Sequence, residues 1–420
     1  MAQFHSLGIF FSINNYTSTF GTNDYTLYYP YIILFPYICF SSFLPVNYYG
    51  NYYIEVRMNN SQSSVSKSYS IQALRAIAAL FVVCDHTITQ FNIYHHVPGL
   101  TGAVLDNIQG VGTVGVYIFF IVSGYIMSFT TFNKKWDKDQ AFLFMKKRVL
   151  RIYPTYWIWL TILIVFWLSG LVLKQHDYSL TKMITSYLLL PYSDSTPNKI
   201  NPVLGQGWTL IYEVFYYLLF AILIFLNTPK KHAILILALI FGVVVFMGKN
   251  SATTLPALDF FMASPIFYFF IAGMALYTWQ AEILRFYSEL SVIYLAVSIC
   301  ILCFYILAFS GFTQEYKEIA MALLSLVLFT LFLAKGGNCK KLSVLGDASY
   351  SLYLSHGFVV MGYGVLCKTF SFSMLTLFIA GILTVLMSVL IGLLSYYLVE
   401  KKIQFVINGK FMTPARNGFV

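Results

Sequence analysis

Charged side chains are scarce in this chain of 420 residues. Asp, Glu, Lys and Arg together make up 10% of it, whereas soluble domains carry about 25%. Apolar residues make up 59%, and the aromatic residues alone 19%. A soluble fold of this length cannot bury so much apolar surface, so the composition excludes a soluble globular protein.

Cysteine is also scarce, with six residues spread along the chain. Only Cys300 and Cys303 form a C-x-x-C pattern, and it lies inside an apolar run with no second pair and no neighbouring His. Redox and zinc motifs need more ligands or a soluble context. We therefore expect no disulfide framework and no metal site.

Basic residues are missing from the first part of the chain, which holds no Lys or Arg before Arg57. A secretory signal peptide would begin with a basic region. Residues 1–57 are therefore an atypical N-terminal segment. Met58 is an alternative translation start, followed by a short polar cytoplasmic lead at 58–70, and whether residues 1–57 are translated stays open.

Long apolar runs are abundant, and each is about as long as a helix that crosses the ~30 Å hydrocarbon core of a membrane. They predict an all-α membrane protein, a polytopic bundle of about ten transmembrane helices that forms one domain over residues 71–399. A basic tail follows at 400–420. The expected spans are 71–93, 111–130, 154–173, 209–227, 232–248, 259–278, 291–309, 317–334, 347–367 and 374–399.

Lys and Arg are distributed unequally between the two sets of loops. The loops after even-numbered spans, together with the tail, carry 17 of them, and the loops after odd-numbered spans carry 6. Basic residues accumulate on the cytoplasmic side of membrane proteins. Both termini are therefore expected in the cytoplasm.

Two basic side chains in the first span are expected to share a helix face. Arg75 and His86 are 11 residues apart, about 20° past three full turns and roughly 16 Å along the axis. Asp85 points about 100° away from His86, but it can still belong to the same polar cavity. Buried ionisable residues in spans indicate function, although Arg75 can also extend to the interface and the His–Asp pair can serve packing alone.

Two further ionisable residues lie inside later spans. Glu213, in GWTLIYEVFYY, is expected at a depth similar to that of His86, so the two can meet. A structural ion pair is the alternative. His356 follows the polar run SYSLYLS, which suits either the wall of a water-filled cavity or hydrogen bonds between helices. Asp347 is interpreted as the cap or first-turn acid of that span.

The basic segment MKKRVLRIYP ends with Arg148 and Arg151, and Pro154 is expected to begin the third span. A spacing of three places the two arginines on one helix face. Paired guanidinium groups suit bidentate phosphate binding. Simple anchoring at the cytoplasmic surface is the alternative.

These segments together resemble membrane-bound acyltransferase family 3, the bacterial O-acyltransferases of surface polysaccharides and lipopolysaccharide. The resemblance covers roughly residues 70–400 and rests on five segments in the family's order. They are Arg75 and His86 in an R-x10-H pattern, FFIVSGYIM at 119–127, RVLRIYP at 148–154, WTLIYEVFYY at 208–217 and SYSLYLSH at 349–356.

The resemblance implies a multi-pass protein of the bacterial inner membrane and residue roles within it. His86, Glu213 and Arg75 are implied as catalytic, and Arg148 and Arg151, with Arg75, as donor-binding. The side chains implied around a cavity are Asp85, Ser123, Tyr125, Trp208, Tyr353 and His356.

The resemblance also implies the substrates. Acetyl-CoA would be the cytoplasmic acyl donor, with no permanently bound cofactor, no metal and no nucleic acid. A hydroxyl of a glycan or lipid-linked saccharide outside would be the acceptor. His86 would serve either as general base or as acyl acceptor. A transporter or flippase for a glycan lipid is the alternative, because such proteins also place charged groups at mid-membrane.

Overall fold

The computed structural model describes residues 56–411, apart from short gaps at 96, 98, 109, 174–175, 195–198, 251–254, 310 and 336–339. Contacts divide the chain into two compact units, and the larger one includes Ser66–Val420. Of the other, Phe10–Val65, only the helical residues 56–65 are described. The atypical segment 1–57 thus lies almost entirely outside the described residues.

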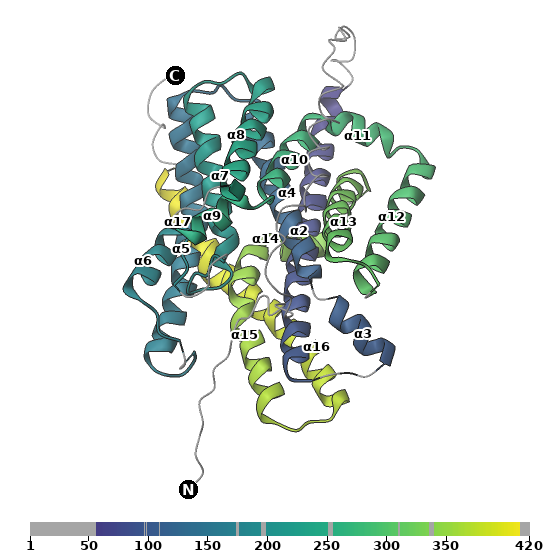
Figure 1. Cartoon of the computed structure of the whole chain (residues 1–420). Helices are drawn as coiled ribbons and strands as arrows, with labels where there is room; N and C mark the ends of the chain where they lie inside the picture. The colour runs from purple at the N-terminus through teal and green to yellow at the C-terminus, as the bar shows by residue number, and fades with distance from the viewer. Residues whose placement is uncertain are drawn as a thin grey trace. The chain divides into compact units, whose positions relative to one another are not determined.

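The described residues are helical or irregular, and they contain no strand. The helices of Figure 1 are α2 (Val56–Tyr94), α3 (Gly99–Asn107), α4 (Val111–Thr131), α5 (Lys138–Leu168), α6 (Leu180–Leu188), α7 (Gly207–Phe225), α8 (Lys230–Asn250), α9 (Pro256–Ala263), α10 (Phe267–Thr278), α11 (Gln280–Phe286), α12 (Leu290–Ala308), α13 (Gln314–Lys335), α14 (Lys340–Asp347), α15 (Ser349–Thr369), α16 (Met374–Ser395), the π-helix η1 (Tyr396–Glu400) and α17 (Lys401–Phe411).

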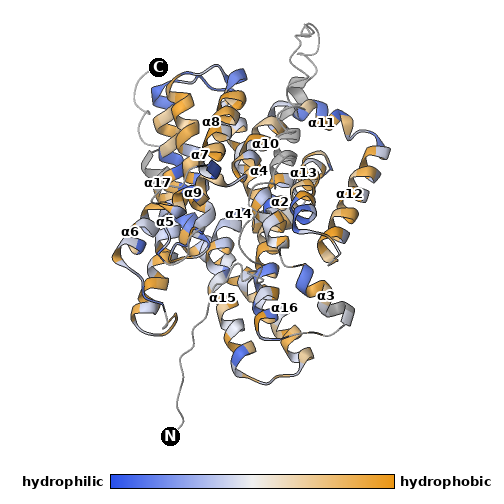
Figure 2. Ribbon diagram, in the orientation of Figure 1, coloured by the Kyte–Doolittle hydropathy of each residue, from blue (hydrophilic) through white to orange (hydrophobic). Residues whose placement is uncertain are grey.

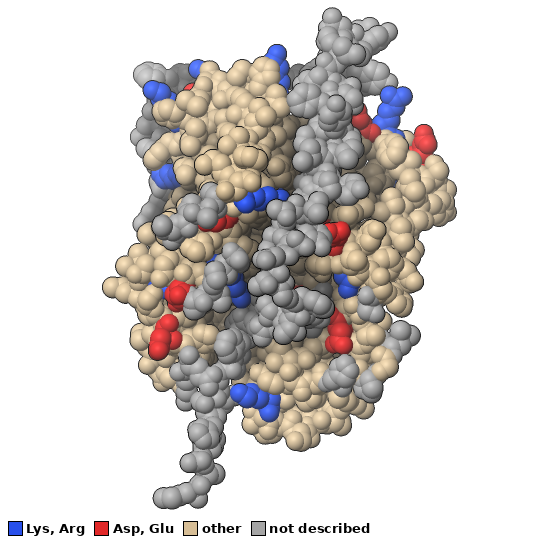
Figure 3. Space-filling model, viewed as in Figure 1, with Lys and Arg blue, Asp and Glu red and all other residues tan. Residues whose placement is uncertain are grey.

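Nine helical stretches within the described residues are long and apolar enough to cross a membrane. The predicted all-α polytopic membrane fold is confirmed. Figure 2 shows mostly apolar residues along α12 and α16, and Figure 3 shows few charged side chains over one face of the molecule. Large apolar side chains are exposed on the outer helices, as expected for a surface in contact with lipid.

The ninth predicted span, 347–367, corresponds to α15, which is 21 residues long but is not among the nine apolar stretches. Its first half carries Ser349, Ser351, Ser355 and His356, and all four are fully buried. A helix enclosed by other helices does not need the apolar surface that lipid contact requires. The burial of α15 therefore explains its polarity.

Two local predictions about helix ends were wrong. Pro154 does not begin a span, because α5 runs through it without a break from Lys138 to Leu168. Asp347 does not cap α15, because it is the last residue of α14 and Ala348 occupies the N-cap position. As a result, Arg148 and Arg151 lie on the same continuous helix as the third span.

Glycine permits close contact between α4 and α10. A Cβ atom on Gly124 would lie 2.0 Å from the carbonyl oxygen of Phe270, and one on Gly273 would lie 2.0 Å from that of Ile121. Small residues of this kind allow helix backbones in membranes to approach each other. This contact fixes the α4 segment that carries Ser123.

Two loops that the charge distribution assigns to the same side of the membrane contact each other in the structure. The Lys230 ammonium donates to the carbonyl oxygens of Phe132, at 2.6 Å, and of Lys134. This joins the α4–α5 loop to the start of α8. On loops assigned to the opposite side, Lys317 donates to Asn107 at 2.8 Å.

The short helix α6 runs back along α5. Near its start, the Tyr178 ring lies 5.1 Å from that of Trp167. At its end, the carbonyl oxygen of Leu188 accepts a hydrogen bond from Tyr153. Tyr153 and Trp167 are 14 residues apart on α5, which is about 21 Å of helix. The segment that follows α5 therefore returns by about that distance before α7 begins.

Candidate active site

Side chains from five helices meet around a cavity of about 100 Å³. Three arginines reach it, Arg75 from α2 and Arg148 and Arg151 from α5. Its polar wall also includes Ser123 of α4, Thr209, Glu213 and Tyr217 of α7, and Ser349, Tyr350 and Tyr353 of α15. The structure thus brings the R-x10-H arginine and the R-x-x-R pair together, as the sequence predicted for a shared site.

Among the described residues, none of the three guanidinium groups forms an ion pair with a carboxylate. In the described part of the chain, no Asp or Glu oxygen lies within 4.0 Å of them. Arg75 is only 7% exposed and donates to Gln72 at 2.8 Å. Arg148 lies over the rings of Phe144 and Tyr217, at 5.4 and 5.6 Å, and its buried Nε has no acceptor. Glu213, Asp347 and Glu400 are close enough to interact electrostatically with Arg75, but none of them forms an ion pair with it. A buried cation that lacks a directly paired carboxylate is costly, so the cavity is suited to an anion.

Glu213 is the one carboxylate on the cavity wall, and hydroxyl groups fix its orientation. Ser123 donates to its Oε1 at 3.1 Å, and Tyr217 donates to the same oxygen. The Ser123 and Tyr217 oxygens are themselves 3.0 Å apart. With three arginines and one carboxylate on the wall, the cavity keeps an excess of positive charge.

His86 and His356 form a direct contact between α2 and α15. Nδ1 of His86 lies 2.8 Å from Nε2 of His356, and the ring centroids are 5.1 Å apart. The pair does not line the cavity itself. Tyr353 lies between the cavity and the histidine pair, since it lines the cavity and its ring centroid lies 6.0 Å from that of His356.

Glu213 is not the hydrogen-bond partner of His86, although their expected depths permitted it. Glu213 bonds to Ser123 and Tyr217, and His86 bonds to His356. The sequence left two roles open for His356, the wall of a cavity or a hydrogen bond between helices, and it did not identify His86 as the partner. Its contact with His86 joins residues 270 positions apart, and helix periodicity carries no information about such a distance.

Asp85 belongs to the packing of α2 against α4. Its carboxylate accepts the backbone N–H of Gly110, the N-cap residue of α4, and that of Gly112. A Cβ atom on Gly112 would lie 2.9 Å from the Cβ of Asp85. Asp85 therefore satisfies the free N–H groups at the start of α4, and its predicted place in the cavity was wrong.

Two other predicted cavity residues also lie elsewhere. Tyr125 donates to Gln280 at 3.0 Å, and its ring packs against Tyr277 and Phe329. It is two residues from Ser123, about 200° around the helix, so it faces the core instead. Trp208 packs edge-on against Tyr212. Ser123 and Tyr353, by contrast, line the cavity.

Glu400 is a buried carboxylate that the sequence analysis did not select. It is 2% exposed, ends the π-helix η1, and accepts a hydrogen bond of 2.7 Å from Ser351. This bond connects the end of α16 to α15. The sequence did contain a signal for Glu400, which is a single carboxylate at the end of an apolar span. Such a group needs a hydrogen-bond or ionic partner when it is buried.

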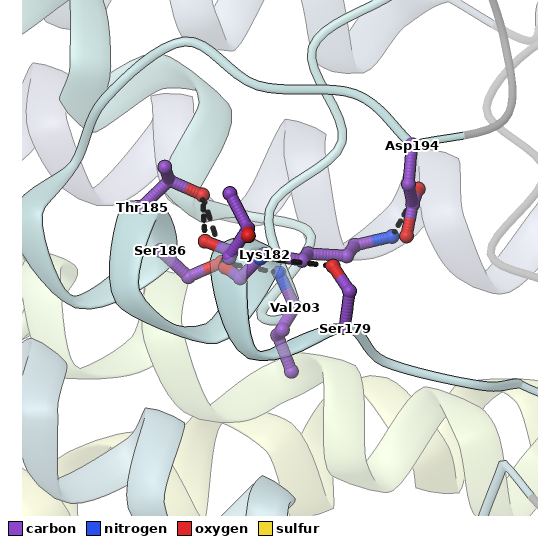
Figure 4. A network of polar contacts seen from close by, with 7 residues as sticks. Ser179, Lys182, Thr185, Ser186, Asp194 and Val203 are labelled. Carbon is purple, nitrogen blue, oxygen red and sulfur yellow. Dashed lines mark hydrogen bonds and ion pairs between the residues drawn. The ribbon is translucent and has the colours of Figure 1, made fainter.

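A polar network stabilises α6 and the segment that leads to α7 (Figure 4). Lys182 is 3.0 Å from Asp194, and Ser179 caps the helix by accepting the N–H of Lys182. Ser186 accepts the N–H of Val203 at 2.9 Å. Burial and the nearby Asp194 carboxylate raise the pKa of Tyr178 to about 12. These bonds define the conformation of the chain just before Gly207.

An apolar helical bundle with a cation-lined internal cavity and a nearby pair of imidazoles defines a membrane-embedded transferase. The chain belongs to the Acyl_transf_3 family of acyltransferase domains, whose model matches residues 68–393. The protein is therefore an acyltransferase, and every site residue predicted from the sequence falls within the matched range.

Two curated proteins are similar to the chain. It is 28% identical to the exopolysaccharide production protein ExoZ of Rhizobium meliloti (strain 1021) over 308 residues, which cover 69% of this chain and 89% of that protein. It is 24% identical to the O-acetyl transferase of Shigella phage Sf6 over 222 residues, 50% of this chain and 61% of that protein. No solved structure matches the chain.

Proposed function

We propose that the protein transfers an acetyl group from cytoplasmic acetyl-CoA to a hydroxyl of a cell-surface or lipid-linked glycan on the outer side of the bacterial inner membrane. The names of the two relatives support a polysaccharide acceptor and an acetyl group. The observation that carries the proposal is the cavity with three arginines and no paired carboxylate.

The cavity suits the donor because coenzyme A carries several phosphate groups at one end and the thioester at the other. Guanidinium groups bind phosphate through two parallel hydrogen bonds. Arg148 and Arg151 present theirs from one face of α5, and Arg75 presents its own from α2. The flexible arm between phosphates and thioester can then extend along α2 and α15 toward His86.

His86 is the group proposed to carry the chemistry. An imidazole nitrogen takes the proton of the sugar hydroxyl, the hydroxyl oxygen attacks the thioester carbonyl, and the carbon–sulfur bond breaks. The coenzyme A thiolate then takes the proton from the imidazolium. In the other route, the imidazole receives the acetyl group first and passes it to the sugar.

The charge distribution supports the proposed sidedness. The 17 basic residues of one set of loops support a cytoplasmic location for that side, and the Lys230 contacts join two loops of that set. Arg148 and Arg151 are two of these 17 residues and lie at the end of the basic segment MKKRVLRIYP. The donor would enter from the cytoplasm, and His86 lies further along α2, toward the acceptor.

The test is acetyl-CoA turnover by purified protein in lipid nanodiscs, combined with mass spectrometry of surface glycans from a deletion strain. We expect acetyl-CoA to be consumed and the glycans of the deletion strain to lack acetyl groups. A glycan-lipid transporter would consume no acetyl-CoA, and its deletion would change the amount of surface glycan instead.

A further inference from the structure

The hydrogen bonds around His356 define which of its nitrogens carries a proton. Nδ1 of His356 lies 3.2 Å from the carbonyl oxygen of Leu352, one turn earlier on α15. A carbonyl oxygen only accepts hydrogen bonds. Nδ1 of His356 is therefore the protonated nitrogen, and in the neutral ring Nε2 keeps a lone pair.

That lone pair defines the proton position on His86. Nε2 of His356 is 2.8 Å from Nδ1 of His86, and the ring planes differ by 22°. The rings thus meet edge to edge in nearly one plane, which aligns an N–H of one ring with the lone pair of the other. Since His356 is the acceptor, His86 is the donor through Nδ1.

We propose that His356 is a positioning residue that keeps His86 in its Nδ1–H tautomer, so that Nε2 of His86 is the reactive nitrogen. This inference rests on the proposed function of His86. His356 is 0% exposed, so water does not compete with His86 for its lone pair. A second group that orients a catalytic imidazole through its other nitrogen is a general device.

The proton balance of the reaction follows from the same chain of bonds. When Nε2 of His86 takes a proton from the acceptor hydroxyl, the new positive charge faces the lone pair of His356. Nδ1 of His356 continues to donate to the Leu352 carbonyl, which accepts this hydrogen bond but cannot take up the proton. The proton therefore remains on Nε2 of His86 until the thiolate of coenzyme A takes it.

Two substitutions of His356 separate acceptor chemistry from packing. His356→Gln keeps an oxygen that can accept from Nδ1 of His86, whereas His356→Leu has a similar size and no acceptor. We expect His356→Leu to lower kcat by about 100-fold or more, because loss of the correct tautomer has effects of that size in other enzymes. We expect His356→Gln to keep a larger fraction of the wild-type kcat than His356→Leu does. The KM for acetyl-CoA should be unchanged in both.

Nitrogen NMR of the full-length protein with ¹⁵N-labelled histidine, in nanodiscs without substrate, reads the tautomer directly. The His86 signals are assigned by their loss in His86→Gln, and His95→Gln is the matched control. His95 follows α2 and contacts the Cys367 carbonyl at 3.0 Å, away from the site. We expect His86 to carry its proton on Nδ1 in the wild type and to shift toward Nε2–H in His356→Leu.

The inference is overturned if wild-type His86 carries its proton on Nε2, or if His356→Leu keeps the wild-type kcat. The proposed function fails by a different result. Suppose that His86→Ala still transfers acetyl groups while the wild-type spectra show the Nδ1–H tautomer of His86. The hydrogen bonds between the two rings would then be confirmed, and the catalytic role of His86 would be excluded.

Discussion

The hydroxyl oxygens of Thr209 and Tyr353 lie 2.9 Å apart and connect the first turn of α7 to α15. Both residues line the arginine cavity. Tyr353 is also one turn before His356 on α15. A single buried helix thus carries part of the cavity wall and one member of the imidazole pair, so a displacement of α15 would alter both together.

Substitution of His86 tests the proposed chemistry. We expect His86→Ala to lower acetyl transfer by about 10²–10⁴-fold, the usual effect of losing a general base, while the protein still inserts and binds acetyl-CoA. His86→Gln should be equally inactive, because an amide accepts neither a proton nor an acyl group. Transfer assays and binding titrations in nanodiscs measure both effects. Near-wild-type transfer by His86→Ala would remove His86 from the mechanism.

The R-x-x-R pair is expected to bind the donor. Arg148→Ala combined with Arg151→Ala should raise the dissociation constant of acetyl-CoA, because the cavity loses two of its three guanidinium groups. Arg148→Lys should restore only part of the affinity, since Lys lacks the planar fork. The matched control is Lys147→Ala, an exposed cation on the same helix. Unchanged affinity in the double variant would support simple anchoring instead.

Glu213 and its two hydroxyl partners should behave as one unit. Glu213→Gln should reduce transfer and leave residual activity, because an amide oxygen can still accept from Ser123 or Tyr217. Ser123→Ala and Tyr217→Phe should each have a smaller effect. Both act through the same carboxylate oxygen, so their effects should not add to that of Glu213→Gln in a double-mutant cycle. Full additivity would show that the three side chains act independently.

Asp85 is expected to matter for stability rather than for chemistry. Asp85→Ala removes the acceptor at the start of α4 and should destabilise the protein by about 1–2 kcal/mol, visible as a lower Tm. Asp85→Asn should be nearly neutral, since Asn is an equally good cap. Both variants should retain acetyl transfer in proportion to the folded fraction. An inactive but fully stable Asp85→Asn would instead show that Asp85 takes part in the chemistry.

Cysteine labelling tests the orientation in the membrane. In a background without native cysteines, Lys135→Cys in the α4–α5 loop should resist an impermeant thiol reagent in intact cells. Ser371→Cys in the turn between α15 and α16 should react. Both positions are exposed in the structure, so accessibility to the reagent depends on the side of the membrane. The reverse pattern would place the arginine cavity near the outer side and exclude a cytoplasmic donor.

Patterns that act within one helix were predictable from the sequence, whereas contacts between distant helices were not. The 11-residue spacing of Arg75 and His86 and the pairing of Arg148 with Arg151 describe single helix faces, and three of these four side chains reach one cavity. The His86–His356 contact depends on how α2 packs against α15. The role of Asp85 was missed for the same reason, because its partners are backbone groups of another helix.

The return of the chain along α5 determines where α7 begins. A Cβ atom on Gly207 would lie 2.9 Å from the Tyr156 hydroxyl, and Tyr156 is 12 residues before the end of α5, about 18 Å along the helix. The described residues between Leu189 and Gln206 are irregular, and lipid tails cannot cover such backbone. Water or protein must therefore surround it at that depth.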